Sequence, residues 1–182
     1  MELRKLTWND FPNERERNFI KETFKELPGN VIDVLKYKKA PPFVRVYVAT
    51  RNGIVSKKVL QLFVCDCAIH IESFYTNFAI RKAIDVSELF SKGFATEYEH
   101  KQACNNIDDD LPRKALLNFN PNAVIGFGAR EAARCFDYDF SFRNKVDFDL
   151  REKIKNYLYN AELERQAKTL LYLIQDDLNS GF

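Results

Sequence analysis

The side chains best suited to bind a ligand lie between positions 36 and 58. This segment of 23 residues contains seven lysines and arginines and no aspartate or glutamate, whereas the whole chain has 28 basic and 26 acidic residues and a net charge of +2. Tyr37, Phe43 and Tyr47 lie among these cations, and such interleaving is typical of surfaces that bind the phosphates and bases of RNA. We therefore predict contact with RNA or another polyanion; lysines that only keep a proline-containing loop in solution are the alternative. The predicted contact residues are Lys36, Lys38, Lys39, Arg45, Arg51, Lys57 and Lys58.

The two arginines of this segment are expected to contribute most. An arginine can bridge two phosphate oxygens through parallel N–H groups, whereas a lysine acts as a point charge. We expect charge reversal of Arg45 and Arg51 to weaken RNA binding more than reversal of Lys38 and Lys39. Phosphate contacts would also make binding depend strongly on salt and only slightly on base sequence.

A second candidate anion site is Gly126-Phe127-Gly128, in front of a predicted helix. The third glycine of the dinucleotide-binding fingerprint would fall at Glu131 and no strand precedes the motif, which excludes that fingerprint. Backbone N–H groups at the start of the helix could still face an anion, with Arg130 and Arg134 one turn apart beside it. The alternative is a glycine-rich helix cap followed by two solvated arginines.

Residues that could support catalysis or bind a metal do not form a recognisable site. Cys65 and Cys67 are two positions apart on a predicted helix and point in different directions, so buried reduced thiols are expected. His70 is predicted to be a partly buried structural residue, and the acidic run 108–110 a solvated helix cap. We expect neither a cofactor nor a metal, and no enzyme activity; an enzyme site assembled from distant residues is a remaining alternative.

Helical spacing of apolar residues predicts an all-α fold. Asn13 and Asn30 are typical N-caps of two short helices, and apolar residues then recur every three or four positions over 54–82, which predicts one long central helix. A second long helix is predicted over 149–178. The chain has only 6 glycines and 6 prolines, too few for the turns of a many-stranded fold.

The segment 43–50 is locally ambiguous. Val44, Val46 and Val48 alternate with other residues before Asn52-Gly53, a pattern typical of a strand that enters a hairpin. No partner strand can be found, so we assign the segment as irregular or helical.

Shorter helices are predicted at 85–92, near Pro112 and from Ala129 onward. The polar stretch that begins at Gly93 and includes the acidic run separates the two long helices. We place a boundary there between two small helical subdomains, an N-terminal one over 1–95 that contains the basic segment and a C-terminal one over 96–182.

No targeting or membrane segment is evident. The opening residues have no apolar stretch, and no run approaches the roughly 18 apolar residues of a transmembrane helix. The four cysteines are too few and too irregularly spaced for a disulfide framework. We expect a cytoplasmic protein that does not associate with membranes.

The sequence resembles a family of viral proteins over its whole length. Val46–Gly53 (VYVATRNG) and the following Lys57–Cys67 (KKVLQLFVCDC) are similar to the RNA silencing suppressors of closteroviruses. The resemblance implies an all-helical, two-part subunit that assembles into a ring and binds RNA with little sequence preference. It also implies that the protein sequesters small RNAs, single-stranded or duplex, from silencing in the host cytoplasm.

Two further expectations accompany this interpretation. The C-terminal stripe of Leu171, Ile174 and Leu178 and the many aromatic residues predict a homo-oligomer in which another copy covers part of this surface. The main alternative function is a helical protein-interaction adaptor that does not bind nucleic acid, with aromatic helix faces as its partner surfaces.

Overall fold

The computed structural model describes residues 3–51, 53–72, 78–108, 110–138 and 148–180. All regular secondary structure in these residues is helical, which confirms the predicted all-α fold. The elements are the 3₁₀ turn η1 (Trp8–Asp10) and the helices α1 (Glu14–Thr23), α2 (Val31–Lys36), α3 (Pro42–Ala49), α4 (Lys57–Glu72), α5 (Phe78–Ser91), α6 (Glu97–Asn105), α7 (Asp110–Leu117), α8 (Pro121–Tyr138) and α10 (Phe148–Asn179).

The first two helices begin at the predicted asparagine caps. The side-chain oxygen of Asn13 accepts hydrogen bonds from the N–H groups of Arg15 and Glu16, at 2.9 and 3.2 Å. Asn30 caps α2 in the same way, accepting from Ile32 and Asp33. Each cap satisfies N–H groups that have no partner within the helix, which fixes where the helix starts.

The ambiguous segment 43–50 is helical. It forms α3, which begins with Pro42 at a position where the missing N–H costs nothing. Val44, Val46, Val48 and Ala49 are all buried, because α3 packs between α2 and α10 and is enclosed on several sides. Burial of most of the helix surface, apart from the face that carries Phe43 and Tyr47, explains the run of small and β-branched residues that also suited a strand.

The predicted single helix over 54–82 is wrong. This part of the chain forms α4 and α5, two helices that pack against each other, and the predicted helix at 85–92 is the second half of α5. Both helices direct an apolar face toward one shared core, so the helical period continues from one to the other. Periodicity therefore identified the helices but not their separation.

The predicted long C-terminal helix is confirmed as α10. Its apolar stripe packs within the chain: Ile174 is buried, and Leu171 and Leu178 pack against the same core. This location removes the reason for expecting another copy to cover that stripe.

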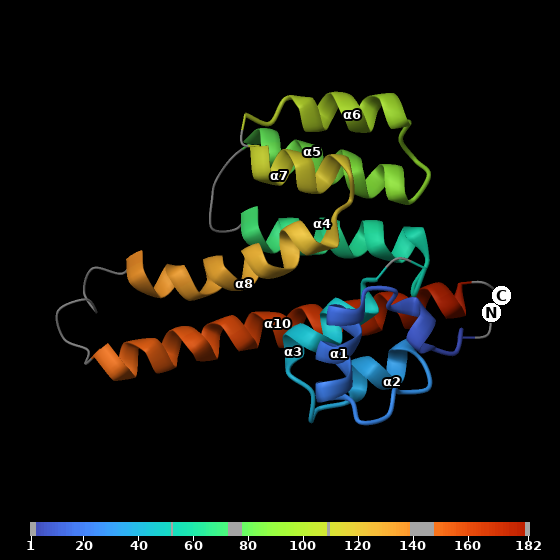
Figure 1. Cartoon of the computed structure of the whole chain (residues 1–182). Coiled ribbons are helices and arrows are strands. Elements are labelled where there is room, and N and C mark those ends of the chain that lie inside the picture. Colours follow the sequence, from blue (N-terminus) through green and yellow to red (C-terminus); the bar gives the residue numbers. More distant parts are fainter. Residues whose placement is uncertain (1–2, 52, 73–77, 109, 139–147, 181–182) are drawn as a thin grey trace.

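The helices form layers around α4 and α10 (Figure 1). The short helices α5, α6 and α7 lie on one side of α4, whereas α2 and α3 pack against the C-terminal half of α10. The predicted boundary near residue 95 falls between α5 and α6, which pack together. Since α10 also contacts α2, α3 and α4, one hydrophobic core crosses that boundary.

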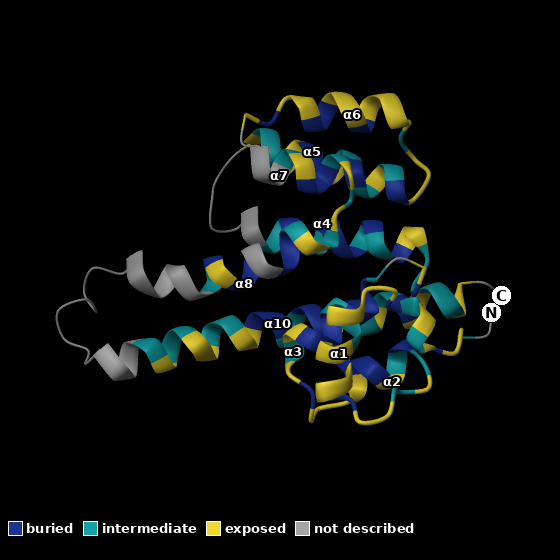
Figure 2. Cartoon of the chain, in the orientation of Figure 1, coloured by how far each residue is buried: buried dark blue, intermediate teal, exposed yellow. Residues whose placement is uncertain are grey.

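The two halves of α10 differ in burial (Figure 2). Buried side chains recur from Glu162 to Ile174, but none occurs between 152 and 161. This N-terminal half lies beside α8 and extends away from the remaining helices. It includes the half-buried apolar residues Ile154 and Leu158, together with Tyr157, which is 72% exposed.

Candidate nucleic-acid interface

The basic segment 36–58 runs from the end of α2 through α3 to the start of α4. Lys36 ends α2, Lys38 and Lys39 lie in the turn that follows, and Lys57 and Lys58 begin α4. The two arginines lie within α3 and directly after it. The structure separates these seven cations into side chains held inside the fold and side chains left in solvent.

Arg45 is buried inside the fold. Its side chain is 1% exposed and its guanidinium donates to the carbonyl oxygens of Leu35 at 2.8 Å and Ala40 at 3.2 Å. The remaining nitrogen pairs with the Glu164 carboxylate on α10. The predicted RNA contact through Arg45 is wrong, because every donor group of its head is engaged or enclosed by protein.

Lys38 shares the Glu164 carboxylate with Arg45. Its ammonium lies 2.9 Å from the second oxygen of Glu164, and its side chain is 64% exposed. Partial burial acts to raise the pKa of Glu164, but the hydrogen bond from Lys38 and the charge of Arg45 together lower it. The carboxylate therefore stays ionised and attracts both cations toward α10.

Arg51 is also paired within the chain. Its Nε and Nη2 atoms lie 2.7 and 3.0 Å from the two carboxylate oxygens of Glu16 on α1. Its guanidinium also lies over the ring of Tyr47, 5.4 Å from the centroid. Burial raises the pKa of Tyr47, the charge of Arg51 opposes this effect, and Glu16 adds to it. Arg51 is thus engaged within the chain, with 29% of its side chain exposed, and its leading part in RNA binding stays a prediction.

The other four lysines of the segment are exposed, but at two different places. Lys36 and Lys39 flank the α2–α3 turn, at the lower edge of the view in Figure 1, whereas α4 begins near the right-hand side. Lys57 also lies close enough to Glu97 on α6 to lower the pKa of that carboxylate, after the larger effects of Lys101. The segment therefore presents two separate lysine pairs and not one continuous basic surface.

The predicted anion site at Gly126-Phe127-Gly128 is wrong. Both glycines lie inside α8, where backbone N–H groups are used by the helix itself. The helix begins earlier, at Pro121, and Asn120 accepts a hydrogen bond from the N–H of Asn122 at 3.1 Å. Arg130 is exposed on α8; the side chain of Arg134 lies outside the described part of the structure.

One polar cluster, which joins α4 to α10, could not be found from the sequence. Glu162 is 3% exposed and accepts hydrogen bonds from Arg165 at 2.9 and 3.0 Å and from Gln166 at 2.9 Å, and His70 lies 3.0 Å away. Arg165 also contacts Asp66 on α4 at 2.6 Å. Only the i, i+3 and i, i+4 spacings within α10 were visible in the sequence, because the α4 partners lie about a hundred positions away. His70 is therefore partly buried and has a partner, as predicted.

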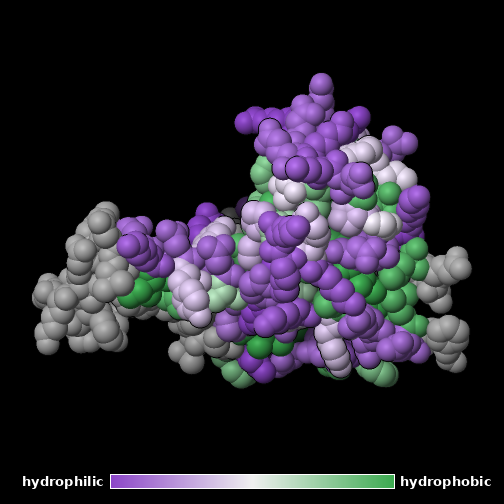
Figure 3. Space-filling view, turned by 90° about the horizontal axis from the view of Figure 1, so that it is seen from below, coloured by the Kyte–Doolittle hydropathy of each residue, from purple (hydrophilic) through white to green (hydrophobic). Residues whose placement is uncertain are grey.

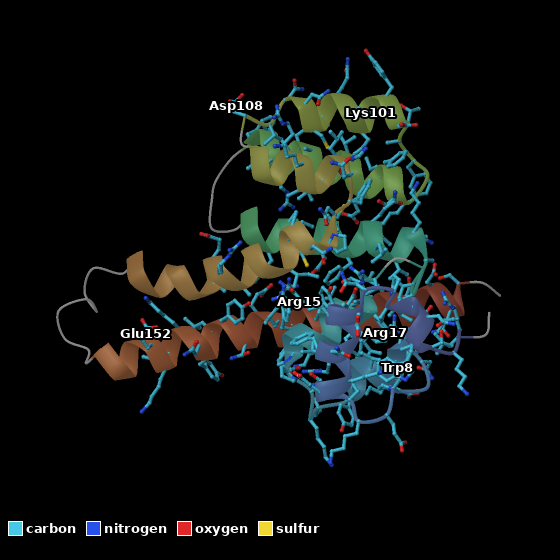
Figure 4. The ribbon with its side chains drawn as sticks, viewed as in Figure 1. Trp8, Arg15, Arg17, Lys101, Asp108 and Glu152 are labelled. Carbon is cyan, nitrogen blue, oxygen red and sulfur yellow. The ribbon has the colours of Figure 1, made fainter. Side chains whose placement is uncertain are left out.

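The cysteines and the possible metal ligands do not form a reactive site in the described residues. Cys65 and Cys67 are free and buried, as predicted, and Cys104 is free and buried too. Burial raises the pKa of Cys65 to about 12. In the described part of the chain, no three histidine, cysteine or acidic side chains form a group that could hold a metal ion. Asp108 lies beside α7 and far from Glu152 on α10 (Figure 4).

His100 is enclosed by aromatic rings. Its ring contacts those of Phe90 and Phe119, with centroid distances of 5.0 and 4.8 Å, and the two phenylalanine rings also contact each other at 6.1 Å. Its Nε2 lies 3.3 Å from the carbonyl oxygen of Leu116. Burial lowers the pKa of His100. These contacts describe a neutral structural imidazole between α5, α6 and α7.

Hydrophobic surface gathers near the end of the molecule where both termini lie (Figure 3). An apolar groove there is lined by residues that include Leu3, Val31 and Leu178. Ser56 donates to Asp177 across it at 2.9 Å. The groove therefore lies where residues of the N-terminal part of the chain meet the C-terminal end of α10.

Comparison with protein-family models, curated proteins and solved structures finds no match to this chain. No helix in the described residues combines the length and the apolar character needed to cross a membrane. The functional interpretation therefore depends on the geometry of the site.

Proposed function

We propose that the protein binds RNA with little sequence preference and that Lys36 and Lys39 contact its phosphates. One observation carries this proposal: both side chains are exposed at one turn, in a segment without any acidic residue. Glu164, which reaches this turn from α10, is already paired with Lys38 and Arg45. The two lysines are thus free to neutralise phosphates, which is the main source of nonspecific affinity for nucleic acids.

Arg45 supports this proposal as a positioning residue. The two carbonyl groups that it binds belong to Leu35 and Ala40, which directly precede Lys36 and follow Lys39. The buried guanidinium thus fixes both ends of the turn that presents the lysines. A turn held in this way loses little conformational entropy when it binds a ligand.

The resemblance of 46–53 and 57–67 to closterovirus suppressors supports a more specific role. In this role the protein captures small RNAs, single-stranded or duplex, in the host cytoplasm and withholds them from the silencing machinery. It acts by binding, without catalysis or a cofactor, and needs no membrane.

We also propose that the protein forms a homo-oligomer, through a surface other than the one first predicted. The N-terminal half of α10 leaves Ile154 and Leu158 half-buried and Tyr157 exposed, which favours a contact with another copy. Several copies would engage one RNA at high effective concentration. Light scattering should report more than one copy per particle, and a monomer at micromolar concentration would contradict the assembly.

The test compares two charge-matched variants in RNA binding at several salt concentrations. One variant combines Lys36→Glu with Lys39→Glu, and the control combines Lys57→Glu with Lys58→Glu. If the first pair neutralises two phosphates, its reversal should reduce the slope of log affinity against log salt by about 1.4 to 1.8. The control, at the other lysine pair, should change affinity and slope much less.

Equal affinity and an equal salt slope in the first variant and the parent would contradict the proposed interface. A larger effect of the control would place the interface at the start of α4. Both variants should give the helical circular dichroism of the parent, since all four side chains are exposed.

The adaptor function is the second candidate, supported by a different surface. Phe94 and Tyr98 are 78% and 69% exposed next to Leu89, and the N–H of Phe94 donates to the carbonyl of Leu89 at 2.8 Å. Exposed aromatic residues are common at protein interfaces. Absence of any salt-dependent RNA binding would favour this alternative.

A further inference from the structure

Three side chains form a continuous stack along one face of α3. The Arg51 guanidinium lies over Tyr47, and the Tyr47 ring stacks on Phe43 with centroids 5.8 Å apart and an interplanar angle of 23°. Phe43 and Tyr47 are four positions apart on α3 and so lie on one side of the helix, and Arg51, just beyond the end of α3, extends the stack. Glu16 holds Arg51 at one end, so the stack has a fixed end and a free end.

The free end is Phe43, whose side chain is 37% exposed. Phe43 lies in the first turn of α3, shortly after the turn that Lys36 precedes and that contains Lys39. Arg45, two positions further on, binds the carbonyls on both sides of that turn. An exposed ring and two exposed ammonium groups are therefore held at the same end of α3.

Stacked rings and lysines at one site suit single-stranded RNA better than duplex RNA. In a duplex the bases are paired and stacked internally, so a protein reaches mainly phosphates and 2′-hydroxyls. In a single strand the bases can turn outward and stack on aromatic side chains, a contact worth roughly 1 to 3 kcal/mol per base. Phe43 supplies such a ring, whereas Arg51 is held by Glu16 at the opposite end of the stack.

We infer that an unpaired base stacks on Phe43 while its flanking phosphates contact Lys36 and Lys39. The site then prefers single-stranded RNA to a blunt duplex of the same length. This inference rests on the proposed RNA-binding function and adds the strand form that the site recognises.

The experiment measures the affinity of a Phe43→Leu variant for a single strand and for a blunt duplex. Leucine keeps an apolar side chain at the start of α3 but removes the ring. We expect the affinity for the single strand to fall about 10-fold, within the range of base stacking. Affinity for the duplex and both salt slopes should stay unchanged, because no charge is removed.

Two control variants make the result specific. Phe43→Tyr retains the ring and should retain single-strand affinity. Phe94→Leu removes an exposed phenylalanine between α5 and α6, away from α3, and should change neither affinity. A single strand that carries 2-aminopurine should lose fluorescence on binding to the parent and to Phe43→Tyr, which reports stacking even if the leucine variant folds poorly.

The outcomes separate this inference from the proposed function. If RNA binding is salt-dependent but Phe43→Leu leaves the affinities unchanged, or lowers them equally for both RNA forms, stacking on Phe43 is wrong and the proposed RNA-binding function stands. Unchanged 2-aminopurine fluorescence at saturation would lead to the same conclusion. If the parent binds neither RNA form, the proposed function fails and the inference fails with it.

Discussion

The arginines and the lysines of the segment 36–58 carry the same charge but occupy different environments. Arg45 is buried and Arg51 is paired with Glu16, whereas Lys36 and Lys39 are exposed. A planar guanidinium with five donors can satisfy several acceptors at once, and it stays charged when buried. The difference shows that charge density along a sequence counts cations but does not distinguish those that hold the fold from those available to a ligand.

Among the changes that test this comparison, Arg45→Met should cause the largest loss of stability. Methionine keeps much of the volume but removes donors to Leu35, Ala40 and Glu164. Loss of the guanidinium leaves the enclosed carbonyl groups of Leu35 and Ala40 without this donor, and should lower the free energy of unfolding by about 2 to 4 kcal/mol in total. Chemical denaturation followed by circular dichroism measures the change.

Arg45→Lys serves as the matched control for charge. A lysine restores the cation but not the fork of donors, so it should recover only part of the lost stability. If Arg45→Met lowers the free energy of unfolding by less than about 1 kcal/mol, the assignment of Arg45 as a structural residue is wrong.

A smaller loss is expected for Arg51→Met. The Glu16 side chain is 8% exposed, so removal of its partner leaves a poorly solvated carboxylate. We expect the free energy of unfolding to fall by about 1 to 3 kcal/mol. A double-mutant cycle with Glu16→Gln isolates the pair, and a coupling energy near zero would show that the ion pair does not stabilise the fold.

Sequence patterns predicted the helices better than their three-dimensional relations. The caps at Asn13 and Asn30 and the long α10 follow from local chemistry, which involves only nearby residues. The separation of α4 from α5 could not be predicted, because both contribute to one core with the same period. The anion site predicted from Gly126 and Gly128 was also wrong, because α8 continues through both glycines without a turn.

The candidate site shows the same limit. Exposed lysines at the α2–α3 turn were predicted, but the burial of Arg45 depends on Glu164, a residue 119 positions away. Arg51 likewise finds its partner on another helix. One feature of the sequence could have predicted the burial of Arg45. The alternating valines beside it indicate a buried segment, and a cation inside such a segment tends to pair within the protein.

The pH dependence of stability tests the Glu164 contact at a finer level. Lys38 and Arg45 hold the pKa of Glu164 below its ordinary value of 4.5 despite the opposing effect of burial. A carboxyl with a lowered folded pKa stabilises the protein above its unfolded pKa, and this contribution is lost as pH falls through the folded pKa. Relative to Glu164→Gln, the parent should therefore lose stability as pH falls below about 4.5.

Denaturation of both proteins from about pH 6 to about pH 3 measures this difference. Other carboxyl groups titrate in both proteins, so only the gap between the two curves reports Glu164. A gap that stays constant through the acid range would show that Glu164 has the same pKa in the folded and unfolded chains.

The smallest effect on stability is expected for the combined change Lys36→Ala and Lys39→Ala. Both side chains are exposed at the α2–α3 turn, and substitutions at such positions usually change the free energy of unfolding by less than about 0.5 kcal/mol. The same variant should nevertheless lower the salt slope of RNA binding by about 1.4 to 1.8, because two phosphates lose their cations. Denaturation and RNA titration of one protein sample measure both quantities. A loss of stability above about 1 kcal/mol would place these lysines in the same structural class as Arg45, and the contrast between the arginines and the lysines would no longer hold.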